Sequence, residues 1–447
     1  MPPPWNRSAK TLANIAVSQP EPVNNAIPAA FIPPQLNGYL QVLPQDLFTS
    51  MARCAALSSV APSLHLALET ASRSLLEVLV DDTPPDSDLL KDIEDLVDFE
   101  RTGLAGRVGA GFTDLTMMFL GYNWRDLASA QITSRPLADF IYEGGNATGH
   151  GAVLVEAKAS FSGKATASSI KTTTESGYSN QVEPHLGAPC SAGRIIYGYA
   201  VGFVARPVLP PPATKWAGIH IAEATHPTLP GAGPVPPVSS SAASGSSQPS
   251  SSGGGPGQAA TPPSSPASTP VSWRTALGNY RAISMLIGAA DLYDAISNLL
   301  VGRQAPQTQA FRRLRSGDRF FLVADRNAFA ISGQATVQPF AIDEETAEAF
   351  LAELQRAIAG RVESLELPIA PTTLGVSHEQ EGPPYVLFPD GLAMLLKWNE
   401  DSLRRIWSLN SGWGGKTAFA QQLNAPQVEA PGFYQGVGFA QKQDFYR

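Results

Sequence analysis

The feature that most constrains this chain is a long uncharged stretch in its middle. From Pro227 to Ser272 the sequence runs for 46 residues without a charged side chain, and Ser, Pro and Gly account for 31 of them. Such a segment has too little apolar surface to offset the entropy of ordering, so it predicts a flexible linker. The linker divides the 447 residues into 1–226 and 273–447, and each part is long enough to bury a core.

Charge and cysteine content exclude several classes of protein. The net charge of −8 gives no global positive field that would attract nucleic acid or an anionic membrane. Cys54 and Cys190 are too few for a disulfide scaffold or a cysteine-based zinc site. The first residues lack the apolar core of a secretory signal, and the most apolar long stretch, Ala282 to Val301, contains two aspartates. We therefore expect a cytoplasmic protein without a membrane segment.

The first part of the chain divides again at about residue 86. Residues 1–43 have the composition of a loose arm, and apolar residues at helical spacing from Pro44 to Val80 predict two helices, so residues 1–86 form an arm with a helical extension. In residues 87–226 the expected order is helix, strands, helix, strand. The expected elements are a helix over Leu89–Phe99, a Gly-rich turn over Gly103–Gly111, a helix over Phe112–Tyr122, strands over Phe140–Tyr142 and Ala152–Val155, a helix late in 160–183, and a buried strand over Arg194–Arg206.

The part that follows the linker, residues 273–447, predicts a separate α+β domain. Its apolar spacing indicates a long helix from Trp273 to Val301 and a second helix from Glu344 to Ile358. A turn signal between two apolar runs predicts a hairpin from Tyr385 to Leu396.

The predicted hairpin over residues 140–155 carries the chemistry. Asp139 precedes its first strand, and Glu156-Ala157-Lys158 ends its second. Because side chains alternate along a strand, Glu156 and Lys158 project from one face, and the hairpin can return Asp139 to the same end. Two converging carboxylates are the hard oxygen ligands that Mg²⁺ prefers, with Mn²⁺ as the alternative ion, and a neighbouring lysine can serve an attacking water. The pattern therefore predicts metal-dependent cleavage of a phosphodiester.

At these residues the sequence resembles the PD-(D/E)XK, or restriction-endonuclease-like, nuclease superfamily. The resemblance is carried by Pro136-Leu137-Ala138-Asp139 and Glu156-Ala157-Lys158, with Ala138 at the position where the family has proline. The expected element order from about Leu89 to Arg206 also resembles the family's αβββαβ core. The resemblance implies an α/β fold of the α+β type in residues 87–226 and a magnesium-dependent, endonuclease-like hydrolase that acts on DNA.

The resemblance also implies a role for individual residues. In the family, two carboxylates and a backbone carbonyl bind the metal, a lysine serves the water, a glutamate of the preceding helix adds a ligand, and a glutamine of the following helix assists. In this sequence these roles fall on Asp139 and Glu156, Ala157, Lys158, Glu100 and Gln181, respectively. Glu94 and Asp98 compete with Glu100 for the helix position.

Other interpretations of the same residues stay open. Asp139 can be a turn residue and Glu156 with Lys158 a surface ion pair, since E-x-K is a short pattern. The chain can also be a non-catalytic nucleic-acid or protein interaction protein that retains the fold, or a delivered nuclease toxin, and the C-terminal domain can bind a protein partner. A basic cluster fits either a solvated helix end or a contact to the DNA backbone. It consists of Arg303, Arg312, Arg313, Arg315, Arg319 and Arg326.

Overall fold

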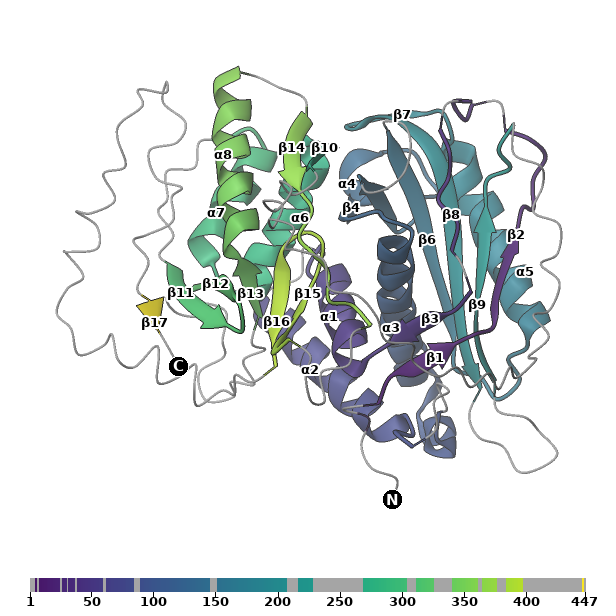
Figure 1. The fold of residues 1–447 in the computed structure, drawn as a ribbon. Coiled ribbons are helices and arrows are strands. Elements are labelled where there is room, and N and C mark those ends of the chain that lie inside the picture. The colour runs from purple at the N-terminus through teal and green to yellow at the C-terminus, as the bar shows by residue number, and fades with distance from the viewer. Residues whose placement is uncertain are drawn as a thin grey trace, which may run out of the picture.

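The structure is a computed structural model of the chain. It describes residues 5, 8–24, 26–29, 31–36, 38–58, 62–83, 89–144, 151–206, 216–227, 268–303, 311–324, 340–360, 364–375, 383–396 and 444–445. Two halves lie side by side, residues up to 227 in one and residues from 268 in the other (Figure 1). Most of the predicted linker, residues 228–267, and most of the turn predicted between the hairpin strands, residues 145–150 of 143–150, lie outside the described residues.

The described elements of the first half follow one another as short strands, helices and then a sheet. They are β1 (Lys10–Leu12), β2 (Ile15–Ser18), β3 (Leu40–Val42), α1 (Pro44–Ala55), α2 (Pro62–Leu79), the 3-10 helix η1 (Lys91–Asp95), α3 (Asp98–Phe119), β4 (Trp124–Leu127), α4 (Ala128–Gln131), β5 (Phe140–Glu143), β6 (Ala152–Ser160), α5 (Ala167–Gly177), the π-helix η2 (Tyr178–Val182), the 3-10 helix η3 (Glu183–His185), β7 (Pro189–Cys190), β8 (Gly193–Arg206) and β9 (Trp216–Glu223).

One large sheet organises this half. Among the described residues its strand order is β2-β9-β8-β6-β5-β4, with β7 paired to β8. β4, β5 and β6 pair antiparallel, whereas β8 pairs parallel to β6 because α5 carries the chain back across the sheet. The predicted hairpin is confirmed, since Phe140 lies opposite Val155. The predicted mixed α+β class is also confirmed.

The helix before the sheet differs from its prediction. Instead of two helices around a Gly-rich turn, α3 is one helix of 22 residues, and the region predicted as the first helix forms the 3-10 helix η1 and the first residues of α3. Two of its glycines are sites of close packing: a Cβ on Gly109 would lie 2.6 Å from the Cβ of Ala159, and one on Gly111 would lie 2.6 Å from Cγ of Met51. The glycines therefore let α3 approach β6 and α1, and they do not end the helix.

The N-terminal arm is packed in its described residues. β2 pairs parallel with β9 at the edge of the large sheet, and β1 pairs antiparallel with β3. Trp5 is buried, and its ring packs edge-on against Phe48 of α1 at 5.8 Å. The arm thus contributes to the first half through backbone pairing, which its composition did not indicate.

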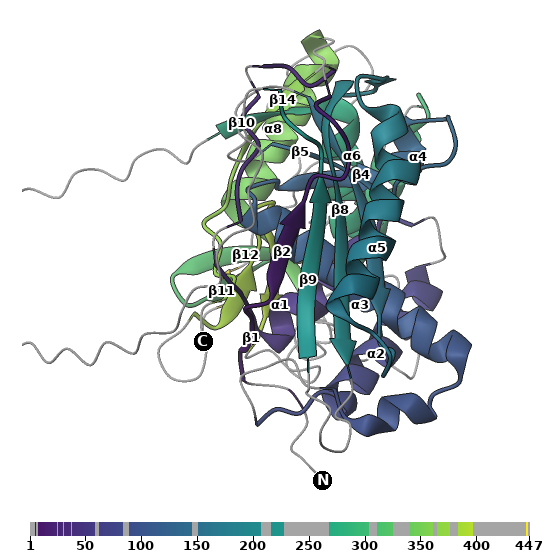
Figure 2. The same ribbon diagram turned by 90° about the vertical axis from the view of Figure 1, so that its right-hand side faces the viewer.

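Helices α3 and α5 cover opposite faces of the sheet. Phe112 of α3 stacks on Phe203 of β8 with ring centroids 3.9 Å apart. On the other face, a Cβ on Gly202 of β8 would meet Thr174 and Ile170 of α5. Figure 2 shows α5 beside β8 and β9. Since side chains alternate along a strand, the even-numbered residues of β6 that include Glu156 face α5.

The second half is built around its own sheet. Its described elements are β10 (Ser268–Ser272), α6 (Trp273–Leu286), α7 (Ala290–Leu300), β11 (Phe311–Ser316), β12 (Arg319–Ala324), β13 (Phe340–Asp343), α8 (Glu344–Gly360), β14 (Ser364–Pro368), β15 (Tyr385–Leu387), β16 (Leu392–Leu395) and β17 (Asp444–Phe445). Among these residues the sheet order is β15-β16-β13-β12-β11-β17, while β10 pairs with β14.

Two predictions for this half need correction, and two are confirmed. The last five residues of the predicted linker form β10, because Val271 is buried and the strand pairs antiparallel with β14. The predicted long helix is divided into α6 and α7, since the chain turns at Gly288 with a φ of 76°. The helix α8 and the hairpin of β15 and β16 agree with their predictions.

A buried network of charges joins the two halves. Arg53 of α1 bonds to Asp114 of α3 and to Asp390 before β16, each at 2.9 Å. Arg125 of β4 approaches Asp114 at 3.3 Å and Asp390 at 3.5 Å, and Asn279 of α6 donates to Asp390 at 3.0 Å. The four charged side chains are at most 1% exposed. The second half, predicted as a separate domain, therefore shares a charged core with the first.

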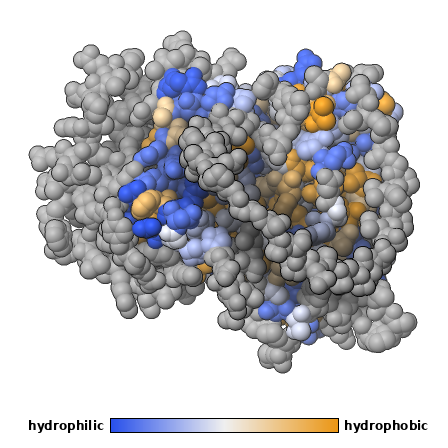
Figure 3. Space-filling model, in the orientation of Figure 1, coloured by the Kyte–Doolittle hydropathy of each residue, from blue (hydrophilic) through white to orange (hydrophobic). Residues whose placement is uncertain are grey.

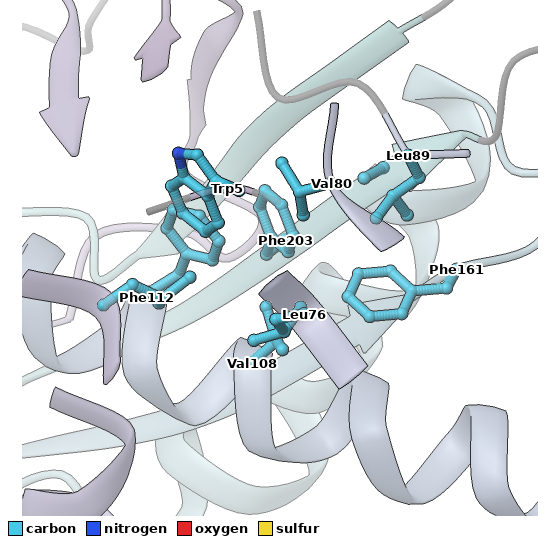
Figure 4. A pocket seen from close by; sticks show the side chains of 10 residues that line it. Trp5, Leu76, Val80, Leu89, Val108, Phe112, Phe161 and Phe203 are labelled. Carbon is cyan, nitrogen blue, oxygen red and sulfur yellow. The ribbon is translucent and has the colours of Figure 1, made fainter. Parts of the chain in front are cut away.

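A small void lies in the described apolar core of the first half. On the face seen in Figure 3, apolar residues gather over the half that holds the large sheet, whereas hydrophilic residues dominate the other half. The void has a volume of about 20 Å³, enough for roughly one water (Figure 4). Its lining side chains are apolar apart from the indole N–H of Trp5, which already donates to the carbonyl of Ser8 at 2.8 Å. It is therefore a packing defect and not a ligand site. Its lining consists of Trp5, Leu47, Leu76, Val80, Leu89, Val108, Phe112, Phe161, Phe203 and Ala205.

Burial of Asp46 predicts that stability depends on pH. Asp46 in the first turn of α1 is buried and accepts hydrogen bonds from the backbone N–H groups of Leu43 (3.2 Å) and Gly375 (3.0 Å). Burial raises the pKa of this carboxyl to about 7. Between about pH 4 and pH 7 the folded chain keeps a proton that the unfolded chain loses, so the free energy of unfolding should fall by up to about 4 kcal/mol as the pH rises.

The variant Asp46→Asn isolates this effect, since an amide can accept the same backbone bonds without ionising. Urea unfolding of both proteins at pH 5 and pH 8 measures it. Between pH 5 and pH 8 the free energy of unfolding should fall less in the variant than in the wild type, and the difference is the contribution of Asp46. Equal pH dependence in the two proteins would contradict the assignment.

Candidate functional site

The end of the β5-β6 hairpin brings three of the predicted residues together. Asp139 directly precedes β5, and continuing the pairing of Phe140 with Val155 by one residue sets it beside Glu156. Oδ2 of Asp139 accepts a hydrogen bond of 2.9 Å from the backbone N–H of Ala157. The side chain of Asp139 is exposed, so its carboxylate lies at the surface end of the site.

Lys158 is held between a carboxylate and an amide. Its Nζ donates to Oε1 of Glu156 and, at 3.0 Å, to Oε1 of Gln181 in η2. The amide nitrogen of Gln181 donates in turn to the backbone carbonyl of Leu137 at 2.9 Å. Gln181 therefore ties the helix after β6 to the loop that carries Asp139, and it fixes the ammonium group of Lys158 at the site.

Close packing of α5 makes this arrangement possible. A Cβ on Gly177 would lie 3.0 Å from Cε of Lys158 and 3.3 Å from Cγ of Glu156. Any larger residue here would press on both side chains. The sequence contains no motif that marks Gly177 or the carbonyl of Leu137, because their role depends on how α5 packs.

The environment of Glu156 is that of a reactive carboxyl. Glu156 is 1% exposed, and no donor among the described residues reaches its Oε2 atom. When Glu156 is protonated, its carboxyl group can share a hydrogen bond with Asp139. Burial and, to a smaller extent, the neighbouring negative charge of Asp139 together raise the pKa of Glu156 to about 7, although the bond from Lys158 acts in the opposite direction. An unpartnered, buried carboxylate oxygen is costly, and a cation would relieve that cost.

These donors fit a hard divalent cation. Asp139 and Glu156 supply carboxylate oxygens, and no described donor occupies the Oε2 atom of Glu156, so an ionised Glu156 can offer it as a ligand. No cluster of three or more His, Cys, Asp or Glu side chains that could hold a metal occurs in the described part of the chain. A metal at this site would thus depend on two carboxylates, the backbone carbonyl of Ala157 and water.

Glu100 is not brought to the site. It is exposed in the first turn of α3, and α3 packs against the face of β6 that carries Ala159, opposite to the face that carries Glu156. The competing residue Asp98 is exposed on the same helix and pairs with Arg101, and Glu94 is exposed in η1. The spacing along the chain could not reveal which face α3 covers.

The basic cluster is partly neutralised in its described members. Arg313 pairs with Glu344 at 2.9 Å, and Arg319 pairs with Asp343 at 3.1 Å. The guanidinium group of Arg313 also stacks over the ring of Phe320. Arg326 lies outside the described residues. These contacts favour a structural role for Arg313 and Arg319.

Comparison of the chain with protein-family models, with curated proteins and with solved structures finds no match. In the described residues, the helices are all too short or too polar to cross a membrane. Any functional assignment therefore rests on the residues and geometry of this chain.

Proposed function

We propose that the chain is a metal-dependent nuclease with a PD-(D/E)XK-type active site, which hydrolyses DNA with a magnesium-activated water. One observation carries the proposal: Asp139, Glu156 and Lys158 converge at one end of the β5-β6 hairpin, and the buried Oε2 atom of Glu156 has no partner among the described residues. A surface ion pair would not need a buried carboxylate with a free oxygen atom.

The order of the elements supports the same proposal. Helix α3, the antiparallel strands β4, β5 and β6, helix α5 and the parallel strand β8 follow one another in the αβββαβ order that the resemblance implies. The candidate residues lie where such a core carries its site, at the adjoining ends of its second and third strands.

Each residue of the site has a chemical role in this proposal. Asp139, Glu156 and the carbonyl of Ala157 would hold the Mg²⁺ ion, which supplies a Lewis acid and lowers the pKa of a bound water. Lys158, positioned by Glu156 and Gln181, orients the attacking water and offsets the charge that develops on the phosphate in the transition state. Gln181 acts through Lys158 and is a positioning residue.

A second candidate is a nucleic-acid or protein interaction protein that keeps the fold without cleavage. The observation that favours it is the ion pair of Lys158 with Glu156, which neutralises one of the two carboxylates. Incubation of supercoiled plasmid with the protein in Mg²⁺, in Mn²⁺ and in excess EDTA separates the two. Cleavage in both metals and none in EDTA is expected, whereas DNA binding without cleavage in any metal would establish the second candidate.

The role of Lys158 can be separated from that of the carboxylates. Lys158→Ala should lower turnover about 10²-fold, because a donor to the transition state is lost. Its affinity for Mn²⁺ should stay equal or improve slightly, since a positive charge beside the cation is removed. Asp139→Ala should instead weaken Mn²⁺ binding directly.

Calorimetric titration of Mn²⁺ into both variants and the wild type measures the difference. Lys171→Ala is the matched control, because Lys171 is an exposed lysine of α5 that pairs with Glu175. If Lys158→Ala loses Mn²⁺ as severely as Asp139→Ala, Lys158 holds the site together and its role in turnover is wrong.

A further inference from the structure

Two hollows lie between the end of β6 and α5, and the first of them includes Lys158. The first has a volume of about 350 Å³ and the second about 240 Å³, and Thr173 lines both. The first is lined by Lys158, Thr172, Thr173, Ser176, Gly177, Asn180 and Gln181. The second is lined by Ala159, Ser160, Ser162, Lys164, Ala165, Ser169, Ile170 and Thr173. Because they share Thr173, the two hollows are neighbours, and we call them together the α5 track.

The track has an unusual composition for a chain with a net charge of −8. Its lining contains hydroxyl groups, amide groups and a lysine towards each end, together with Ala159, Ala165 and Ile170 in the second hollow, but no carboxylate. Of the two lysines, Lys158 is paired with Glu156, which lies outside the lining. The acidic residue of α5, Glu175, is not part of the lining and lies 3.8 Å from Lys171. Such a surface favours an anion that carries several oxygen acceptors.

The track also lacks the means to bind bases. No aromatic side chain lines it, so bases cannot stack there as they do in proteins that hold single strands by their bases. Short hydroxyl and amide side chains reach phosphate and sugar oxygens, and these contacts carry no sequence information. The chemistry therefore fits the backbone of a nucleic acid and not its bases.

We propose that the α5 track binds the sugar-phosphate backbone of the strand that is cut, on one side of the scissile phosphate. The inference rests on the proposed function and names its substrate contact: the DNA backbone, held without base recognition, with Lys158 at the reacting end and Lys164 at the far end. From Ser169 to Gln181 a helical rise gives roughly 18 Å. This length accommodates about five nucleotides at 3.4 Å each.

Binding of a labelled 30-base-pair duplex in EDTA tests the track without cleavage. Lys164→Ala should bind about fivefold more weakly, and its dependence on salt should fall by about one released counterion. Thr173→Glu, which places a carboxylate between the two hollows on an exposed helical position, should weaken binding at least as much. Both effects should be the same for duplexes of unrelated sequence.

Lys171→Ala is the control, since it removes a lysine from the same helix but outside the track, and it should bind as the wild type does. Thermal unfolding of each variant verifies that it is folded. If both track variants bind DNA as strongly as Lys171→Ala while the wild type cleaves DNA in Mg²⁺, the proposed role of the α5 track is wrong and the nuclease proposal stands. If the wild type neither binds nor cleaves DNA, both proposals are overturned.

Discussion

Replacement of Glu156 by glutamine is expected to lower magnesium-dependent DNA cleavage by about 10³-fold or more. The amide keeps the size and shape of the side chain but removes the charge of the more deeply buried of the two proposed ligands. Asp139→Ala should have a comparable effect, because it leaves Glu156 as the one proposed carboxylate ligand. Initial rates of plasmid nicking at several Mg²⁺ concentrations measure the loss.

The stability of Glu156→Gln distinguishes a chemical effect from unfolding. Because burial already disfavours the ionised carboxyl, the variant should have a melting temperature at neutral pH equal to or above that of the wild type. Glu175→Gln, at a half-buried position of α5 where the carboxylate pairs with Lys171, is the matched control and should cleave normally. Full cleavage by Glu156→Gln would exclude Glu156 from the site, and loss of cleavage together with a lower melting temperature would trace the effect to misfolding.

Asp390→Ala is expected to be the most destabilising of the substitutions considered, by about 3–5 kcal/mol. The carboxylate is buried, and it accepts from Arg53 and Asn279 and lies 3.5 Å from Arg125. Its removal leaves two buried guanidinium groups with Asp114 as their shared counterion. An uncompensated charge in a buried site is far more costly than the loss of an exposed pair.

Urea unfolding of Asp390→Ala and of Glu353→Ala tests this expectation. Glu353 of α8 is half-buried, pairs with the exposed Arg356 and accepts a bond of 2.9 Å from the backbone N–H of Glu366, so its removal should lower the free energy of unfolding by only about 1 kcal/mol. Similar values for the two variants would mean that water reaches the network. Because the network spans both halves, the variant should also unfold in one transition at lower urea.

The parts of the fold that the sequence predicts correctly are those that depend on local periodicity. The hairpin of β5 and β6 follows from two apolar runs around a turn signal, and a period of two places Glu156 and Lys158 on one face. The prediction of a Gly-rich turn within α3 is wrong, because glycine is favoured both where a chain turns and where another element packs closely against a helix. Only the packing of Gly109 against Ala159 distinguishes them.

The candidate site was predictable to the same extent. The approach of Asp139 to Glu156 depends on a hairpin, which is a local structure, whereas the position of Glu100 depends on which face of the sheet α3 covers. Nothing in the chain spacing encodes that choice. The α5 track was missed for a related reason, since serines and threonines of a helix form a shared surface only once the helix is packed.

The charged network between the halves also limits how this chain can vary. The first half contains both arginines of the network, Arg53 and Arg125, but only one of its two aspartates, Asp114. The second aspartate, Asp390, lies more than 260 residues after Arg125 in the chain. A fragment that ends before the second half would therefore contain two arginines of the network with one aspartate, which leaves one positive charge without a counterion. A substitution at Asp390 should be tolerated only together with a compensating substitution at one of the two arginines. The sequences of the two halves should therefore vary in a correlated way at these positions.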